Sequence, residues 1–272
     1  MSDIADRCRT FHQLHASGCF VIPNPWDVGS GRVLASLGFP ALATTSAGFA
    51  WSVGRRDGQV PLGQVLGHLQ AVAASVDVPV NADFQGGFAV APEEVASNVA
   101  LAVMTGIAGL SIEDSTGDPS NPLFDFTLAV ERVQAARQAI DRSGTGVLLT
   151  GRSEGFIAGR PDLRETIGRL TAYAEAGAEC LYAPGIRDMN DIRAVVQAVA
   201  PRSVNVLVSS GFATVTQLAE AGVRRISVGG ALARAAWSGF LEAAREIAQR
   251  GTFTNLGRSV PSAEIEGRFG SE

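Results

Sequence analysis

Three features of the sequence predict an α/β fold, a TIM-type (β/α)₈ barrel with a helix before the first strand. Eight short runs of apolar and β-branched residues recur along the chain, helical patterns lie between them, and several of these helices end at glycine. Apolar strands that alternate with helices are typical of a parallel sheet covered on both faces. Eight such units within about 230 residues fit a barrel. A doubly wound open sheet is the alternative, but no GxGxxG segment follows the first strand.

The first half of the barrel is expected to hold four strands. They are CFVIPNP (19–25), PALATTS (40–46), VPVNADF (78–84) and GLSIEDS (109–115). Helical patterns with apolar residues three and four apart are PLGQVLGHLQAVAASV (61–76) and PEEVASNVALAVMTG (92–106). The N-terminal segment MSDIADRCRTFHQLHASG is also helical in pattern and has no signal-peptide core.

The second half repeats the same alternation. Its strands are GVLLTGRSE (146–154), CLYAPG (180–185), VNVLVSS (204–210) and RISVGG (225–230), and RETIGRLTAYAEAG (164–177) is a helical pattern. Helices that close as LASLG, VMTG, AEAG and LAEAG carry the usual C-terminal glycine stop. We therefore expect a single domain over residues 1–272, with the barrel at about 18–251 and a C-terminal helix and tail at 231–272.

Composition excludes several classes of partner. The 272 residues carry a net charge of −5, which provides no basic surface for nucleic acid or an anionic membrane. No apolar run reaches the roughly 18–20 residues of a membrane span. Three cysteines, at 8, 19 and 180, have no metal-like spacing, and their odd number argues against a disulfide framework. We expect a cytoplasmic protein with reduced thiols.

The chain contains no lysine, and all 22 of its basic residues are arginine. Schiff-base catalysis, anchoring of pyridoxal phosphate and a phosphate-loop lysine are therefore excluded.

A barrel carries its chemistry at the C-terminal ends of its strands. The polar or aromatic residues expected there are Asn24, Trp26, Asp27, Thr44, Thr45, Ser46, Asn81, Asp83, Glu113, Asp114, Arg152, Glu154, Tyr182, Ser209 and Ser210, with Asp57 on the loop after the second strand. The three histidines lie in helical patterns, which argues against imidazole catalysis and a histidine-ligated zinc site. The strand ends offer mainly oxygen ligands and one arginine.

These oxygen ligands suit a hard divalent cation such as Mg²⁺. Asn81 and Asp83 share a face because side chains two apart on a strand point the same way, and Glu113 on the next strand can complete the set. A helix cap or a salt bridge is the alternative role for any one acid. Arg152 is suited to pair with a substrate carboxylate through two hydrogen bonds, and its alternative is an internal bridge to Glu113 or Glu154.

Four segments resemble the isocitrate lyase / phosphoenolpyruvate mutase superfamily. They are VIPNPWDVGSGRVLASLGFPALATTSAGFAWSVGRRDG at the start, NADFQGGF as a variant of the DADxGxG metal motif, SIED on the fourth strand and GRSEGF on the fifth. The resemblance implies a Mg²⁺-dependent barrel, with Mn²⁺ as a substitute, that acts on a small 2-oxo or 2-hydroxy di- or tricarboxylate. It also implies a homo-oligomer, a dimer or tetramer, whose last helix is exchanged between subunits.

Carried over residue by residue, the resemblance implies three sets of site residues. Thr45, Ser46 and Ala47 would receive the substrate carboxylate together with Arg152. Asp83, Asn81 and Glu113 would surround the metal. Arg152, Glu113 and Asp57 would take part in catalysis.

The chain departs from the family pattern at three places. Asn81 stands where the first acid of DADxGxG is expected, which removes a charge from the metal site. DSTGDPSNPLFD (114–125) replaces the KKCGH-type loop of the lyase branch, and Ala183 stands where the phosphonomutase branch has a histidine, although Asn121 is available. Glu113 is expected to face the metal, Asp114 to turn away, and the loop to act as a lid with Phe124 or Phe126 excluding water.

A lid without a proton donor favours reactions that need little acid catalysis, namely decarboxylation or C–C cleavage through an enolate, with Tyr182 as one possible donor. Three alternatives stay open. The first is a P–C bond phosphonomutase or a phosphonopyruvate hydrolase-like enzyme. The second is a phosphate-binding barrel that uses the glycines after the last two strands. The third is a barrel that binds a 2-oxo acid without turning it over.

Overall fold

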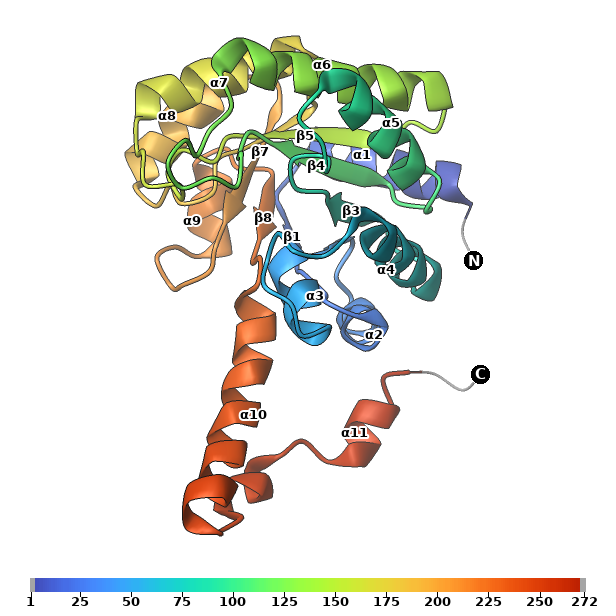
Figure 1. Ribbon diagram of the computed structural model, residues 1–272, viewed down its shortest axis with the longest axis vertical. Coiled ribbons are helices and arrows are strands. Elements are labelled where there is room, and N and C mark those ends of the chain that lie inside the picture. Colours follow the sequence, from blue (N-terminus) through green and yellow to red (C-terminus); the bar gives the residue numbers. More distant parts are fainter. Residues whose placement is uncertain (1–2, 270–272) are drawn as a thin grey trace.

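The computed structural model describes residues 3–269 and contains one eight-stranded parallel sheet that curls into a nearly closed barrel (Figure 1). The strands are β1 (Phe20–Ile22), β2 (Leu42–Ala43), β3 (Val80–Asp83), β4 (Gly109–Glu113), β5 (Leu148–Arg152), β6 (Cys180–Tyr182), β7 (Ser203–Leu207) and β8 (Arg225–Ser227). Their order is β1-β8-β7-β6-β5-β4-β3-β2, and a backbone hydrogen bond from Ala43 N to Pro23 O (3.0 Å) joins the two edges. The predicted eight-stranded parallel barrel is confirmed.

Helices follow the strands as the sequence patterns indicate. They are α1 (Ile4–Ala16), α2 (Val28–Ser36), α3 (Ser46–Ser52), α4 (Leu62–Ser75), α5 (Pro92–Val103), α6 (Phe126–Ser143), α7 (Leu163–Glu175), α8 (Met189–Val199), α9 (Val215–Glu220), α10 (Ala231–Arg250), the 3₁₀ helix η1 (Thr254–Arg258) and α11 (Ser262–Glu266). The three quoted helical patterns correspond to α4, α5 and α7. The expected glycine stops are present: Gly177 and Gly222 have φ of 101° and 88°, which favours glycine.

Side chains that face the barrel interior are unusually polar. They include Asn81, Ser111, Thr150, Asn205, Arg225 and Ser227, each at most 6% exposed. Barrel interiors are more often filled with branched apolar side chains. The apolar core of this protein lies instead between the strands and the helices, where Ala82, Leu110 and Leu149 are fully buried. The polar interior leaves room for a cavity that reaches deep between the strands.

Helix α1 covers the N-terminal end of the barrel. His15 and Phe11 of α1 pack edge to face against each other, and His15 does the same with Phe20 at the start of β1. The Ser203 hydroxyl at the start of β7 donates to His15 O (3.0 Å). The cavity is therefore closed below and opens at the opposite, C-terminal end of the strands.

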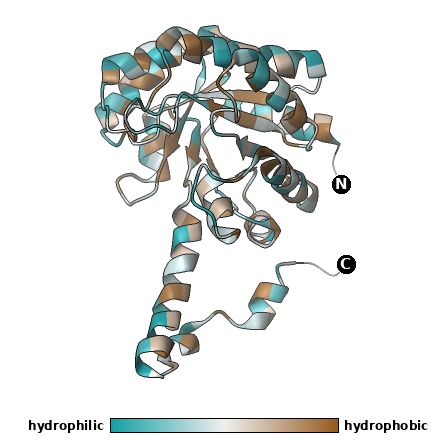
Figure 2. Cartoon of the chain, viewed as in Figure 1, coloured by the Kyte–Doolittle hydropathy of each residue, from teal (hydrophilic) through white to brown (hydrophobic). Residues whose placement is uncertain are grey.

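Helix α10 leaves the barrel and extends away from it, followed by η1 and α11 (Figure 1). Hydrophobic residues, brown in Figure 2, recur along this segment, and Phe240 and Phe253 are 60% and 63% exposed. Within residues 3–269, no helix combines the length and apolarity that crossing a bilayer requires. The expected exchange of the last helix involves a second chain and stays a prediction. The ends of the expected single domain, residues 1–2 and 270–272, lie outside the described residues.

Candidate active site

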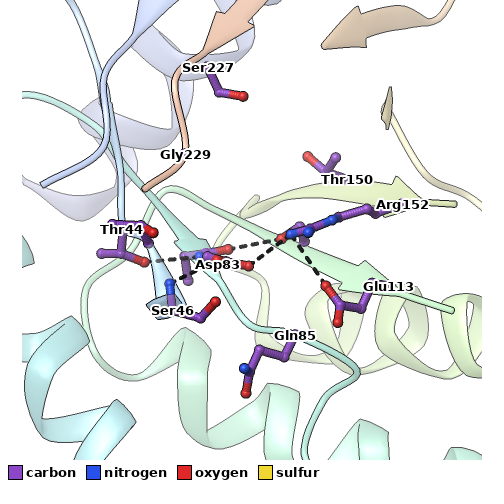
Figure 3. Close-up of polar contacts among 12 residues, drawn as sticks. Thr44, Ser46, Asp83, Gln85, Glu113, Thr150, Arg152, Ser227 and Gly229 are labelled. Atoms are coloured by element: carbon purple, nitrogen blue, oxygen red, sulfur yellow. Dashed lines mark hydrogen bonds and ion pairs between the residues drawn. The ribbon is translucent and has the colours of Figure 1, made fainter. Parts of the chain in front are cut away.

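Arg152, the last residue of β5, gathers carboxylates from neighbouring strands (Figure 3). Its Nη1 lies 3.1 Å from Asp83 Oδ1 and 3.3 Å from Glu113 Oε2, and its Nε donates to Glu154 Oε1. Glu113 is paired with Arg152 in the β4–β5 register, so both side chains leave the sheet at the same level. The internal bridges expected as the alternative role of Arg152 are present. Among the described residues, none accepts a hydrogen bond from its Nη2.

Asp83 is held by the second strand as well as by Arg152. Its Oδ2 accepts a hydrogen bond from Ser46 N (2.9 Å), and its own N–H donates to Thr44 Oγ1 (3.0 Å). Thr45 is the N-cap of α3 and accepts from Gly48 N (3.4 Å). The end of β2 and the start of α3 therefore fix the Asp83 carboxylate beside the guanidinium.

The cluster lies in a cavity of about 270 Å³ that opens at the strand ends. Predicted site residues on its wall are Thr45, Ser46, Ala47, Asp57, Asn81, Asp83 and Arg152. Glu113 does not line the cavity and is connected to these residues by its ion pair with Arg152. The structure thus brings the predicted residues together around one arginine, although their roles stay predictions.

Negative charge exceeds positive charge in this cluster. Burial, opposed by Arg152 and reinforced by Glu154 and Asp83, raises the pKa of Glu113 well above its ordinary value. Burial also raises the pKa of Glu154, and burial followed by repulsion from Asp83 raises the pKa of Asp57. Burial works against the charge on Arg152, but the surrounding carboxylates outweigh it and raise its pKa. One guanidinium therefore cannot neutralise the carboxylates around it.

Glu113→Gln is expected to make the metal-free protein more stable than the wild type at pH 8 and about equally stable at pH 4. Because the folded-state pKa of Glu113 is raised above 4.5, the folded protein binds this proton more tightly than the unfolded chain. The resulting stabilisation is present below the unfolded pKa and is lost as pH rises through the folded pKa. Glutamine imitates the protonated side chain at every pH.

Urea unfolding in the presence of chelator at both pH values measures this difference. Glu175→Gln, which removes one negative charge on the exposed side of α7, serves as the control. A Glu113→Gln protein less stable than the wild type at pH 8 would show that the Glu113–Arg152 ion pair outweighs the excess charge.

The donor set fits a divalent cation. Asp83 and Glu113 are the carboxylates that would hold it. Asn81, the predicted third ligand, does not face them: its Oδ1 has no hydrogen-bond partner but lies beside Gly109 and the Phe11 ring, lower in the barrel, and its amide nitrogen donates to Ala82 O (3.1 Å). Within residues 3–269, no three His, Cys, Asp or Glu side chains are arranged as a complete metal cage. Two carboxylates would suffice for Mg²⁺, which often keeps several waters and uses one or two carboxylates.

Asp114 points away from the cluster, as expected. Its Oδ2 accepts from the Tyr173 hydroxyl (2.6 Å) and from Arg169 Nη1 (3.3 Å), and its Oδ1 accepts from Glu154 N (2.8 Å). The side chain is buried, so Asp114 supports the loop that carries Glu154 rather than the cavity itself.

The loop at 114–125 does not form the expected lid in this structure. Phe124 packs under the guanidinium of Arg132, 3.9 Å from its carbon to the ring centre, and Phe126 begins α6. Neither side chain lines the cavity. The physical reason is Arg132, which is almost fully buried, bonds to the carbonyl groups of Ala89 and Val90, and holds Phe124 over the neighbouring loop.

Two residues of the site, Gln85 and Arg225, are absent from the sequence prediction, and Asn24 is expected at a strand end without a role. Gln85 adopts φ of 49° and directs its amide to Asp57 Oδ1 (3.4 Å), and such strained backbone often occurs at functional sites. Asn24 accepts from both Val228 N (2.9 Å) and Gly229 N (2.8 Å). Arg225 lies inside the barrel and lines the cavity. The sequence signal that could have revealed Arg225 is an arginine at the start of an otherwise apolar strand.

The chain resembles known proteins over nearly its whole length. The family model for phosphoenolpyruvate phosphomutase matches residues 11–248. The crystal structure of a candidate lyase/mutase from Burkholderia cenocepacia J2315 is 45% identical, with a TM-score of 0.94 and 98% of each chain covered. An uncharacterized protein from Mycobacterium tuberculosis (strain ATCC 25618 / H37Rv) is 32% identical over 96% of each chain. The crystal structure of 2,3-dimethylmalate lyase is 27% identical, with a TM-score of 0.86, and covers 99% of this chain and 95% of its own.

More distant relatives are named as lyases and decarboxylases, among them 2-methylisocitrate lyase and oxaloacetate decarboxylase. The family match covers well over half of the chain, and its limits enclose every strand of the barrel. The chain belongs to the phosphoenolpyruvate mutase / isocitrate lyase superfamily.

Proposed function

We propose that the protein is a Mg²⁺-dependent enzyme that cleaves a C–C bond in a small 2-oxo or 2-hydroxy di- or tricarboxylate through an enolate. The observation that carries this proposal is the cluster in which Arg152 meets Asp83, Glu113 and Glu154 at the open end of the barrel. Its excess negative charge suits a divalent cation, and its arginine suits a carboxylate.

Binding would use donors that the chain leaves available. Arg152 Nη2 and the Ala47 N–H in the first turn of α3 can donate to a substrate carboxylate, since the first helical N–H groups have no acceptor within the helix. The Ser46 N–H is already used by Asp83, so Ser46 would contribute its hydroxyl. These groups hold the 2-oxo acid end of the substrate at the cavity mouth.

The chemical step would transfer the electrons of the broken bond to the substrate carbonyl. In a decarboxylation, the bond to the departing carboxylate breaks, CO₂ leaves, and the electron pair forms the enolate, which then takes a proton from water. Arg152 stabilises the developing charge. A divalent cation held by Asp83 and Glu113 would supply further positive charge for stabilising the enolate. Tyr182 also lines the cavity and would be the alternative proton donor to water; burial raises its pKa to about 12, which keeps it protonated but makes it a weaker acid.

The phosphate-binding alternative is weakened by Asn24. The Val228 and Gly229 N–H groups, which a phosphate would need after β8, both donate to Asn24 Oδ1. The phosphonomutase alternative lacks the lysine and the histidine of that branch. The alternative of binding without turnover is favoured by the carboxylates that already pair with Arg152, because they compete with a substrate for the guanidinium. The substrate screen described below distinguishes this alternative from an enzyme.

We also propose that α10, η1 and α11 pack against a second copy of this chain. The segment extends away from its own barrel (Figure 1) and carries exposed apolar residues, which soluble monomers rarely present in one contiguous stretch. Light scattering of the full chain should give a dimer or tetramer, and Phe240→Asp should shift it toward the monomer. A monomeric wild-type protein at micromolar concentration would contradict this proposal.

The function is tested by an NMR screen of oxaloacetate, 2-methylisocitrate, dimethylmalate and phosphonopyruvate. With Mg²⁺, one of the three carbon acids is expected to yield pyruvate or the corresponding 2-oxo acid, and excess chelator is expected to stop the reaction. Pyruvate from phosphonopyruvate alone would favour the P–C alternative. Tight binding of the panel without any product would favour the non-catalytic alternative.

A further inference from the structure

A buried arginine without an acidic partner lies inside the barrel. Arg225, the first residue of β8, is 3% exposed. Its guanidinium donates to Asn205 Oδ1 (2.9 Å) and Thr150 Oγ1 (3.1 Å) and meets His15 Nε2 at 3.3 Å. Among residues 3–269, no carboxylate oxygen lies within 4.0 Å of it. Asn205 and Thr150 are neutral, so only His15 could change the charge around the guanidinium.

His15 is neutral and acts as an acceptor. Its Nδ1 lies 2.7 Å from Phe11 O, a carbonyl that can only accept, so the ring proton is on Nδ1. Burial first, and the charge of Arg225 second, lower the pKa of His15 to about 3. The Nε2 lone pair is thus directed at Arg225, but it brings no negative charge. The positive charge of Arg225 remains uncompensated in the barrel.

Arg225 lines the same cavity as the acidic cluster. The neutral side chains of Asn81, Ser111 and Ser227 line this cavity together with the two arginines. Thr150, which contacts Arg225, is two residues before Arg152 on β5, and two residues of a strand span about 7 Å. We call the end of the cavity at Arg152 the mouth and the end at Arg225 the floor. They are separated by about the length of a short carbon chain.

The two ends of the cavity carry opposite charge. The mouth holds several carboxylates around Arg152, whereas the floor holds one cation with neutral neighbours. A buried charge is costly unless a partner compensates it. A guanidinium has five N–H groups. The described residues use three of them at Arg225, so two remain for a planar anion such as a carboxylate.

We propose that Arg225 forms a second carboxylate subsite on the cavity floor, so that the preferred ligand is a four-carbon dicarboxylate with its 2-oxo or 2-hydroxy end at Arg152. This inference rests on the proposed function for the orientation of the ligand. The inner carboxylate would receive hydrogen bonds from Arg225, and the neutral wall of the cavity would surround the carbon chain.

Calorimetry in the presence of Mg²⁺ tests the subsite with probes that do not react. Malate reaches both ends of the cavity, the half-amide of its C4 carboxylate has the same shape without the inner charge, and oxamate occupies the mouth alone. The wild-type protein should bind malate roughly 10- to 150-fold more tightly than the half-amide, the range expected for charge-assisted hydrogen bonds. Equal affinities would overturn the proposal, and this result needs no variant.

The matching variant is Arg225→Gln, which should lose malate affinity by a similar factor while oxamate affinity changes less than twofold. Arg224→Gln is the control, because Arg224 donates to Gly18 O at the exposed edge of the barrel and should affect neither probe. A folded Arg225→Gln protein that binds malate normally, or that loses both probes equally, would overturn the proposal. Failure of the proposed function is separate: wild-type protein would then bind neither malate nor oxamate.

Discussion

Asp83→Ala is expected to lower kcat/KM for C–C cleavage by roughly 100- to 1000-fold, the usual effect of removing one electrostatic group from an active site. Asp83 joins three parts of the site, since it contacts Arg152, accepts from Ser46 N and is anchored by Thr44. Its loss would remove a proposed metal ligand and also release the guanidinium. Steady-state kinetics at saturating Mg²⁺, together with Mn²⁺ binding by electron paramagnetic resonance, would measure both effects.

Asp114→Asn provides the matched control. Asp114 is also a carboxylic acid and is adjacent to Glu113, but its side chain contacts Tyr173, Arg169 and the Glu154 N–H outside the cavity, and asparagine can still accept from that N–H. Breaking such a buried pair typically costs about 3–5 kcal/mol of stability. The folded fraction should keep near-normal kcat/KM and Mn²⁺ binding. Equal losses of activity in the two variants would mean that the two faces of β4 have been assigned to the wrong roles.

Arg152→Lys is expected to lower kcat/KM by about 30- to 1000-fold, or roughly 2–4 kcal/mol, although it keeps the charge. Lysine lacks the planar fork that reaches Asp83 and Glu154 from Nη1 and Nε and leaves Nη2 for substrate. Because the guanidinium is expected to stabilise the enolate as well as the substrate, kcat should fall together with any rise in KM.

Thermal unfolding beside the kinetics separates a catalytic role from a structural one. Arg137→Lys is the control, since Arg137 also bridges two acids, Asp141 and Glu179, but does so at the helical surface of the barrel. Lower stability with unchanged kcat/KM in folded Arg152→Lys protein would make Arg152 a structural bridge. That result would also remove the main support for the proposed mechanism.

The strand pattern predicted the barrel because each strand is apolar on the face that the helices cover. The same pattern placed Asp83, Glu113 and Arg152 at the ends of adjacent strands, and adjacent strands of a parallel barrel bring such ends together. The alternation of side chains at the end of β4 also separated Glu113 from Asp114, the next residue, and the two face opposite sides.

The interior and the loop could not be predicted in the same way. Whether Arg152 is free or already bridged depends on side-chain distances of a few ångströms, which spacing along the chain does not determine. The position of Phe124 depends on Arg132, 8 residues later, reaching back to carbonyl groups near residue 90. Arg225 has neutral partners from three distant segments, so its burial is a property of the assembled barrel alone.

The central claim is that the strand-end cluster stabilises an enolate, and hydrogen exchange into pyruvate tests it without knowledge of the natural substrate. In D₂O with Mg²⁺, the wild-type protein is expected to exchange the methyl protons of pyruvate, observed by loss of the methyl signal in proton NMR. Chelator and Asp83→Ala should suppress the exchange, and Asp114→Asn should retain it in the folded fraction. Exchange no faster than in buffer, with pyruvate shown to bind, would contradict the claim.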